Sequence, residues 1–364
     1  MRKKLVSILI PSHKRQQLLK RTIYYFLNPK FNFCYFKIMD SSPKPLNLTL
    51  PKNFEYHHYK ENKFVKKILN GVNRINTKYT VIVNDDDFLG FNALKRGISF
   101  LEKNKKYIAY NGEYISFRFL NKINRVIYSG AYLDTIKYNL NFKDKDKISR
   151  IKKMYLNRPH WYNALHRTET LKLCLNIAKL GKDIHFYEIL IPFILGISGK
   201  TKVDNSFWYA KDANVYTDVK VRGQFKRKKM AEEILRKNSI IKKRLIKLMR
   251  ENKINGNDKN LKLLVDNIFL SYFEKYVFEK KKMKNSISIQ KNIQYLKNLL
   301  PDIFLNYLRI NVNYIKNGNH EDTNFNLKKY GPRKNKKTLS DWTDMKVTIL
   351  KFIDFSKIYK NVLD

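Results

Sequence analysis

The sequence predicts an α/β protein in which a mixed, largely parallel sheet carries helices on its faces and a mainly α-helical region follows. Up to about residue 120, short β-rich runs alternate with helical ones, as in strands joined by crossover helices. Beyond about residue 220, apolar residues recur at helical spacing instead. We therefore expect a sheet domain at 1–215 and a basic helical region at 216–364.

Each element is predicted from its own pattern. Short apolar or β-branched runs predict strands at 5–10, 34–39, 55–59, 79–83, 107–110, 114–119, 125–128 and 161–166. Apolar residues three or four positions apart predict helices at 16–27, 63–74, 93–101, 168–180 and 184–195. Pro192 should kink or end the last of these helices, because proline has no N–H to donate. The charged run 143–147 is expected to be a solvated loop.

The charge of the chain favours an anionic partner. It has 75 Lys or Arg against 31 Asp or Glu, for a formal net charge of +44. The densest stretch starts at Lys220 and ends at Arg250, and it could rest on an anionic membrane surface. Its apolar stripe equally permits packing against the rest of the protein. No specific nucleic acid is expected as a partner, because the sequence contains no recognition motif for one.

The cysteines and the N-terminus indicate the compartment. Cys34 and Cys174 cannot form a disulfide framework or a zinc knuckle, which suits a reducing cytoplasm. The apolar run 5–10 is shorter than the roughly 7 to 15 residues of a signal peptide. No stretch approaches the roughly 20 apolar residues that span a bilayer. The expected location is cytoplasmic, either free or peripheral on the inner face of the cytoplasmic membrane.

Three consecutive carboxylates, Asp85, Asp86 and Asp87, follow the strand predicted at 79–83. Crowding like charges is costly unless a cation or a hydrogen-bonded ligand offsets it, and oxygen ligands suit Mg²⁺ or Mn²⁺. Asp40 ends another strand, and ligands of open α/β sheets bind where parallel strands end. The alternative is that the triplet is a solvated turn or caps the following helix.

Four segments together resemble bacterial glycosyltransferases of the GT-A fold, akin to family 2. Segment 6–15 (VSILIPSHKR) is similar to the opening strand and loop of that family, and 37–42 (KIMDSS) to its second strand. Segment 79–88 (YTVIVNDDDF) resembles the strand that bears the DxD element. Segment 162–169 (YNALHRTE) resembles the strand-to-helix segment after the acceptor loop. The resemblance covers roughly residues 1–215.

The resemblance implies metal-dependent transfer of a sugar from a nucleotide-sugar donor to a glycan acceptor, often lipid-linked, such as lipopolysaccharide or capsule. In that case Asp40 would contact the base of the donor and Asp85 its ribose or sugar. Asp87, together with Asp85, would hold the Mn²⁺ or Mg²⁺ that bridges the diphosphate. The other donor-binding residues that it implies are Pro11, Ser12, Arg15 and Asp86.

An inverting transfer needs a carboxylate that takes the proton of the acceptor hydroxyl. Asp183 and Glu188 are the candidates, because they lie where the family carries its acidic motif. We favour Glu188, which lies in an apolar run where a carboxylate is hard to explain as a surface group. The alternative is that Asp183 caps a helix and Glu188 pairs with a lysine.

The acceptor side has weaker signals. His160 and Trp161 could form a platform, since an aromatic ring stacks on the apolar face of a sugar and histidine reaches hydroxyls. The alternative for Trp161 is a place in the core.

Two other functions compete with sugar transfer. A basic nucleic-acid-binding protein would use the positive charge to neutralise phosphates. A sugar nucleotidyltransferase would use a similar sheet and metal, but it would normally carry a glycine-rich loop after the first strand, and segment 11–15 has no glycine. Glycine-rich phosphate loops of dinucleotide enzymes and P-loop NTPases are also absent from the sequence.

Overall fold

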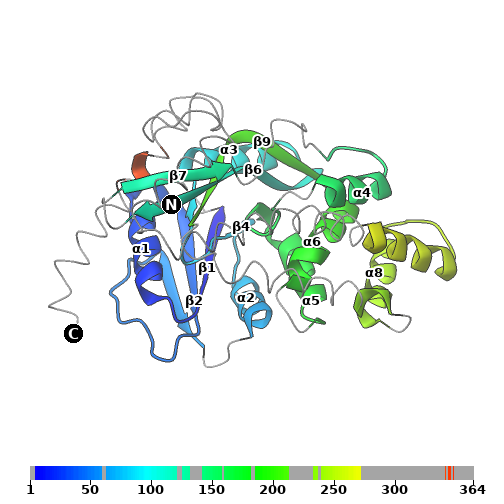
Figure 1. The fold of residues 1–364 in the computed structure, drawn as a ribbon, viewed down its shortest axis with the longest axis horizontal. Helices are drawn as coiled ribbons and strands as arrows, with labels where there is room; N and C mark the ends of the chain where they lie inside the picture. The colour runs from blue at the N-terminus through cyan, green and yellow to red at the C-terminus, as the bar shows by residue number, and fades with distance from the viewer. Residues whose placement is uncertain are drawn as a thin grey trace, which may run out of the picture.

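The protein was analysed as a computed structural model, which describes residues 5–59, 63–120, 125–131, 142–157, 160–181, 185–212, 233–236, 239–271, 341, 343–345 and 347. Within these ranges the fold is α/β, with one mixed sheet of nine strands (Figure 1). The strand order is β3-β2-β1-β4-β8-β6-β9-β5, and β7 pairs with β6. The prediction of an α/β protein with a mixed sheet is confirmed.

The sheet has a parallel half and a mixed half. The parallel half consists of β3 (Phe54–His58), β2 (Cys34–Asp40), β1 (Val6–Ser12) and β4 (Tyr79–Ile82). The mixed half consists of β8 (Leu165–Arg167), β6 (Tyr107–Leu120), β9 (Lys200–Asp212), β5 (Phe88–Leu89) and β7 (Arg125–Ala131). The carboxyl ends of β1, β2 and β4 therefore lie at the same edge of the sheet.

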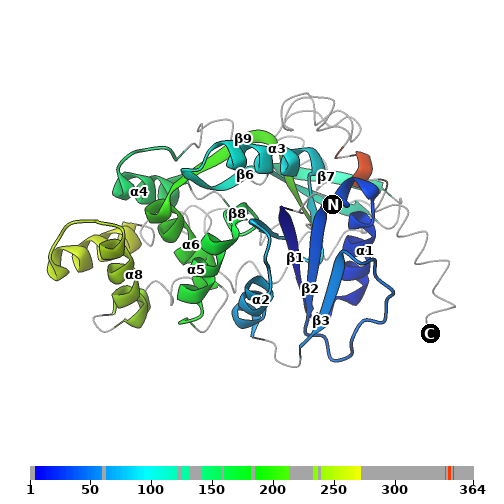
Figure 2. The same ribbon diagram turned by 180° about the vertical axis from the view of Figure 1, so that it is seen from behind.

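Helices cover both faces of the sheet. One face carries α1 (Gln16–Phe26) and α3 (Phe91–Lys103), and the other carries α2 (Phe64–Asn73), α5 (Thr168–Ala178) and α6 (His185–Ser198). Figures 1 and 2 show α1 and α2 on opposite sides of β1 and β2. Alternation along β1 produces this arrangement, because Ile8 and Ile10 join the core under α1 while Leu9 joins the core under α2.

Several elements differ from the prediction. Strands expected at 107–110 and 114–119 form the single strand β6, and the strand expected at 161–166 is reduced to β8. Pro192 was expected to kink or end its helix; it does not end it, because α6 continues to Ser198, and the kink stays a prediction. The neighbours Leu190, Ile191 and Phe193 are all buried, so packing compensates for the missing backbone hydrogen bond.

Two helices of the basic region pack against the helices that cover one face of the sheet. α8 (Ile240–Glu251) and a further helix at 258–271 are described, next to α4 (Lys147–Asn157) and α6. Ile241, Leu245 and Leu248 on α8 are buried in the core that α6 also lines. Most of 216–364 lies outside the described residues, so the domain boundary stays a prediction. No helix among the described residues is long and apolar enough to cross a membrane.

Candidate functional site

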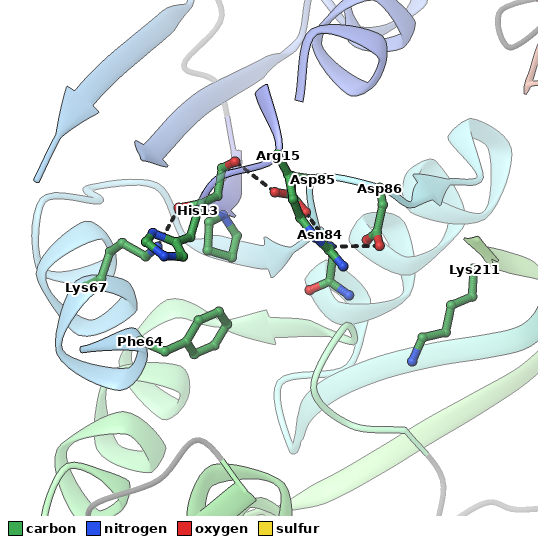
Figure 3. A pocket seen from close by; sticks show the side chains of 10 residues that line it. His13, Arg15, Phe64, Lys67, Asn84, Asp85, Asp86 and Lys211 are labelled. Carbon is green, nitrogen blue, oxygen red and sulfur yellow. Dashed lines mark hydrogen bonds and ion pairs between the residues drawn. The ribbon is translucent and has the colours of Figure 1, made fainter. Parts of the chain in front are cut away.

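A pocket of about 300 Å³ opens where β1 and β4 end and α2 begins (Figure 3). Pro11 and Ser12 at the end of β1 line it, followed by Arg15 in the loop that leads to α1. Asp85 and Asp86 line it from the loop after β4. The remaining wall residues are His13, Phe64, Lys67, Asn84 and Lys211. Of the four segments that resemble one enzyme family, 6–15 and 79–88 line the pocket, whereas 37–42 and 162–169 do not.

Asp85 and Asp86, hereafter the acid pair, are held by one guanidinium group. Arg15 Nη1 donates to Asp85 Oδ1 at 3.0 Å and to Asp86 Oδ2 at 2.8 Å. The second oxygen of Asp85 accepts from the Ser12 hydroxyl at 2.7 Å. The two carboxylates are nearly buried, with 3% and 5% of each residue exposed. Their negative charge therefore needs a nearby cation.

The charges in the acid pair shift the pKa values of its members. Burial raises the pKa of Asp85, and the charge of Asp86 adds to this rise, while Arg15 and Ser12 oppose it. Burial works against the charge of Arg15, but the carboxylates of Asp86 and Asp85 outweigh burial and raise the arginine's pKa. The guanidinium and the acid pair thus stabilise each other's charged forms.

Asp87 has a different environment from the acid pair. Its Oδ2 accepts from Asn84 Nδ2 at 2.7 Å and from the Tyr209 hydroxyl at 3.0 Å, and its Oδ1 accepts from the Asp212 backbone N–H at 3.0 Å. Only 1% of the residue is exposed and it does not line the pocket. Burial and then the charge of Asp86 raise the pKa of Asp87 to about 7. The side chain connects the acid loop to β9, so the geometry does not favour its predicted role as a metal ligand.

Asp40 is also enclosed by the fold. Its Oδ1 accepts from the backbone N–H and the hydroxyl of Ser42, at 2.9 and 2.7 Å, and its Oδ2 accepts from the Tyr56 hydroxyl at 2.9 Å. The residue is fully buried and is not among those that line the pocket. The contact with a nucleotide base that we expected for Asp40 would require Tyr56 or Ser42 to move.

α1 holds the backbone of the acid loop. Arg21 Nη2 donates to the Asp86 carbonyl at 2.7 Å and to Asp212 Oδ2 at 3.0 Å. The Thr22 hydroxyl donates to the Asp85 carbonyl at 2.9 Å. Both α1 side chains are buried. They therefore fix the backbone of the loop after β4, while the side chains of Asp85 and Asp86 face the pocket.

Two pocket lysines were missed by sequence analysis. Lys67 on α2 donates from Nζ to the Ser12 carbonyl at 2.6 Å and to the Ser41 hydroxyl at 2.8 Å. Burial lowers the pKa of Lys67 to about 8, against the opposing charges of Asp40 and Asp85. Lys211 extends from β9 on the opposite side of the pocket (Figure 3). In the sequence, the one sign that Lys67 is buried is its place next to Ile68, among the apolar residues of its helix.

The predicted acceptor platform is only partly available. Trp161 is 1% exposed and its ring packs against Phe142, with 5.8 Å between ring centroids. Trp161 therefore lies in the core, which is the alternative named for it, and stacking on a sugar would require its ring to be uncovered. His160 is half-buried, and its carbonyl accepts hydrogen bonds from Asn111 and Tyr114.

Glu188 lies in the first turn of α6 and is half-buried, whereas Asp183 lies outside the described residues. Burial and then the charge of Glu188 raise the pKa of Tyr162, with further contributions from Asp87, Asp85 and Asp86. The Tyr162 ring stacks on Phe64 at 6.4 Å between centroids, and Phe64 lines the pocket. Tyr162 therefore contacts one wall residue of the pocket, Phe64, and feels the charge of Glu188.

The described residues contain no group of three or more His, Cys, Asp or Glu side chains that could hold a metal ion. The acid pair alone offers two carboxylates at the pocket. Such a pair suits a cation that also takes oxygens from a bound phosphate group, because Mg²⁺ is commonly held by one or two carboxylates plus substrate phosphates.

No known protein-family profile matches the chain, and no curated protein matches it. Among solved structures, the chain is similar to that of S. aureus TarS 1–349, with a TM-score of 0.47 and 11% sequence identity over 74% of this chain and 71% of that one. For S. aureus TarS 1–349 in complex with UDP-GlcNAc, the TM-score is 0.43 and the identity 12%, over 74% of this chain and 81% of that one. At these scores the function has to be argued from the site itself.

Proposed function

We propose that the protein is a glycosyltransferase that moves a sugar from a nucleotide-sugar donor to a glycan acceptor. The observation that carries this proposal is the acid pair, which lines a pocket at the carboxyl ends of parallel strands together with Arg15, Lys67 and Lys211. A diphosphate placed there would meet cations on several sides. Two of the segments that resemble family 2 glycosyltransferases, 6–15 and 79–88, supply most of this wall.

The acid pair fits a divalent cation, Mn²⁺ or Mg²⁺. One oxygen from each carboxylate lies within 3.0 Å of the same positively charged nitrogen of Arg15, so the two oxygens can share one cation. In this proposal the metal ligands are Asp85 and Asp86 rather than Asp85 and Asp87, because Asp87 does not line the pocket and its hydrogen bonds connect it to Tyr209 and Asp212 of β9. When bound, the cation would stabilise the negative charge of the diphosphate leaving group.

Glu188 is the proposed general base of an inverting transfer. Its carboxylate would take the proton of the acceptor hydroxyl as that oxygen attacks the anomeric carbon. A new glycosidic C–O bond forms, the bond from the anomeric carbon to the diphosphate oxygen breaks, and the nucleoside diphosphate leaves. Glu188 suits this role because it is a half-buried carboxylate in the first turn of α6 whose charge acts on Tyr162, and the Tyr162 ring stacks on Phe64 of the pocket wall.

The proposed acceptor is a lipid-linked, cell-surface polysaccharide such as lipopolysaccharide or capsule, and the exposed side of α8 supports a membrane contact. Ile240, Lys243, Lys247 and Arg250 are exposed at helical spacing, opposite the buried stripe. Such a face suits anionic lipid, at about 1 kcal/mol for each basic residue near the surface. Vesicles with and without anionic lipid, tested with Lys243→Glu/Lys247→Glu, would measure this contact.

The function is tested by following nucleoside diphosphate release from a panel of nucleotide sugars, with Mn²⁺ or Mg²⁺ and glycan acceptors. We expect release from at least one donor by the wild type. Glu169→Gln should behave like the wild type, because Glu169 is exposed on α5, where it pairs with Lys172, and does not line the pocket. Failure of every nucleotide and nucleotide sugar to bind, combined with salt-sensitive binding of single-stranded nucleic acid, would favour the nucleic-acid-binding alternative.

A further inference from the structure

Arg15 occupies the place that a shared cation of the acid pair would take. A single nitrogen, Nη1, lies 3.0 Å from Asp85 Oδ1 and 2.8 Å from Asp86 Oδ2 (Figure 3). A divalent cation that bound the same two oxygens would have to displace this nitrogen, because two positive charges cannot share that position. The guanidinium therefore competes with a metal ion for the acid pair.

A diphosphate can remove this competition. Arginine binds phosphate oxygens through two parallel hydrogen bonds and does so more strongly than a neutral donor would. Arg15 lines the same pocket as the acid pair, so a diphosphate bound there would be within reach of its guanidinium. Once Arg15 turns to phosphate, the acid pair loses its cation and the two carboxylates repel each other. A metal ion that binds at this point relieves the repulsion between the two carboxylates. In the empty pocket Arg15 already relieves it, so the metal gains less binding free energy there.

The two arginines near the acid loop differ in their freedom to move. The side chain of Arg15 is 36% exposed and comes from the loop before α1. The side chain of Arg21 is 8% exposed and binds the Asp86 carbonyl and Asp212. Arg21 can thus keep the loop backbone in place while Arg15 leaves the carboxylates.

We propose that Arg15 couples metal binding to donor binding. In the empty pocket it binds both carboxylates of the acid pair and blocks the metal, and when a diphosphate arrives it leaves them and binds the phosphate oxygens. Metal and nucleoside diphosphate then bind with positive coupling, and each raises the affinity for the other by the same factor. This proposal rests on the proposed function in that the diphosphate belongs to the donor. The competition between Arg15 and the metal does not depend on it.

The first test measures Mn²⁺ binding alone, by the electron paramagnetic resonance signal of free Mn²⁺, to the full-length protein. We expect Arg15→Gln to bind Mn²⁺ at least about tenfold more tightly than the wild type, within the usual range of coupling between sites. Lys14→Gln is the matched control, because Lys14 is exposed in the same loop and does not line the pocket. It removes the same charge and should bind like the wild type.

Equal Mn²⁺ affinity in Arg15→Gln, Lys14→Gln and the wild type would overturn the proposal. Arg15→Lys gives a second variant in case the glutamine variant fails to fold. It keeps the charge but reaches the two oxygens less well, so its Mn²⁺ affinity should lie between those of the wild type and Arg15→Gln. An affinity at or below that of the wild type in the lysine variant would also count against competition.

The second test repeats the titration with saturating UDP or GDP. In the wild type the nucleotide should tighten Mn²⁺ binding by about tenfold or more. In Arg15→Gln this factor should fall below about threefold, because the acid pair is already open. An unchanged factor would contradict the coupling role of Arg15. If neither nucleotide binds the wild type, the proposed function fails, while the titration with Mn²⁺ alone still decides whether Arg15 competes with metal.

Discussion

The carboxylates around the ends of β2 and β4 form two groups that differ in what satisfies them. Asp40 and Asp87 accept hydrogen bonds from neutral donors that are fixed in the fold, such as Tyr56 and Tyr209. The acid pair instead faces a pocket and is bridged by the partly exposed Arg15. Neutral, immobile partners indicate a structural carboxylate, whereas a movable cation indicates a site that can exchange it for a ligand.

The largest effect is expected for Glu188, which belongs to neither group of carboxylates. Glu188→Gln removes the proposed base without changing the shape of the side chain, so kcat should fall by about 10²- to 10⁴-fold. Binding of the nucleoside diphosphate should stay within about twofold of the wild-type value. The measurement is steady-state product release combined with nucleotide titration. A kcat close to that of the wild type would remove Glu188 from the mechanism.

Asp86→Asn tests the group that faces the pocket. Loss of one proposed ligand of the cation that would stabilise the diphosphate should lower kcat/KM by about 10²- to 10³-fold, the usual effect of weakening one electrostatic contribution to a transition state. Stability should change by less than about 1 kcal/mol, because the Arg15 partner is partly exposed. Product release and urea unfolding are measured on the same protein. A variant that is active but unstable would show that Asp86 belongs with the structural acids.

Asp87→Asn tests the structural group. An amide keeps one acceptor oxygen and leaves one buried donor, from Tyr209, Asn84 or the Asp212 backbone, without a partner. We expect a loss of about 2 kcal/mol in the free energy of unfolding, seen as a lower urea midpoint. Full stability in this variant, with activity lost, would return Asp87 to the ligand-binding group.

The smallest predicted effect concerns Asp341 and is seen in the pH dependence of stability. It accepts hydrogen bonds from Asn92 at the start of α3. Burial, reinforced by Asp344 and opposed by Asn92 and Arg96, raises its pKa to about 6. Between pH 4 and 6 the folded state then binds a proton more readily than the unfolded state does. The contribution of Asp341 to the free energy of unfolding is therefore present at pH 4 and is lost as the pH rises through 6.

Asp341→Asn should therefore flatten the pH dependence of the melting temperature between pH 4 and 6. Glu169→Gln, which alters an exposed carboxylate on α5, serves as the control and should leave this pH dependence unchanged. Parallel melting curves for wild type and Asp341→Asn across this range would contradict the assigned pKa.

The first half of the sheet could be predicted because β1, β2 and β4 are rich in apolar residues and are followed by or end in polar ones. The same pattern identified the edge where Ser12 and the acid pair meet. β9 could not be predicted, because its first half is polar and its position in the sheet depends on pairing with strands that are distant in sequence, β6 and β5. The pocket residue Lys211 was missed with that strand.

The roles within the acid triplet could not be predicted from sequence either. Asp85, Asp86 and Asp87 are chemically identical neighbours, and only the directions of Arg15 and Tyr209 distinguish them. Trp161 was uncertain for a similar reason, since an indole ring suits both a sugar platform and a core. Its contact with Phe142, distant in sequence, decides for the core.

A structure of the protein with a bound nucleoside diphosphate and Mn²⁺ tests the central claim most directly. The account predicts the diphosphate in the pocket between Arg15 and Lys211, with Asp85 and Asp86 turned to the cation and Asp40 and Asp87 keeping their present hydrogen bonds. A nucleotide bound away from the acid pair, or a cation held by Asp87 instead, would contradict it.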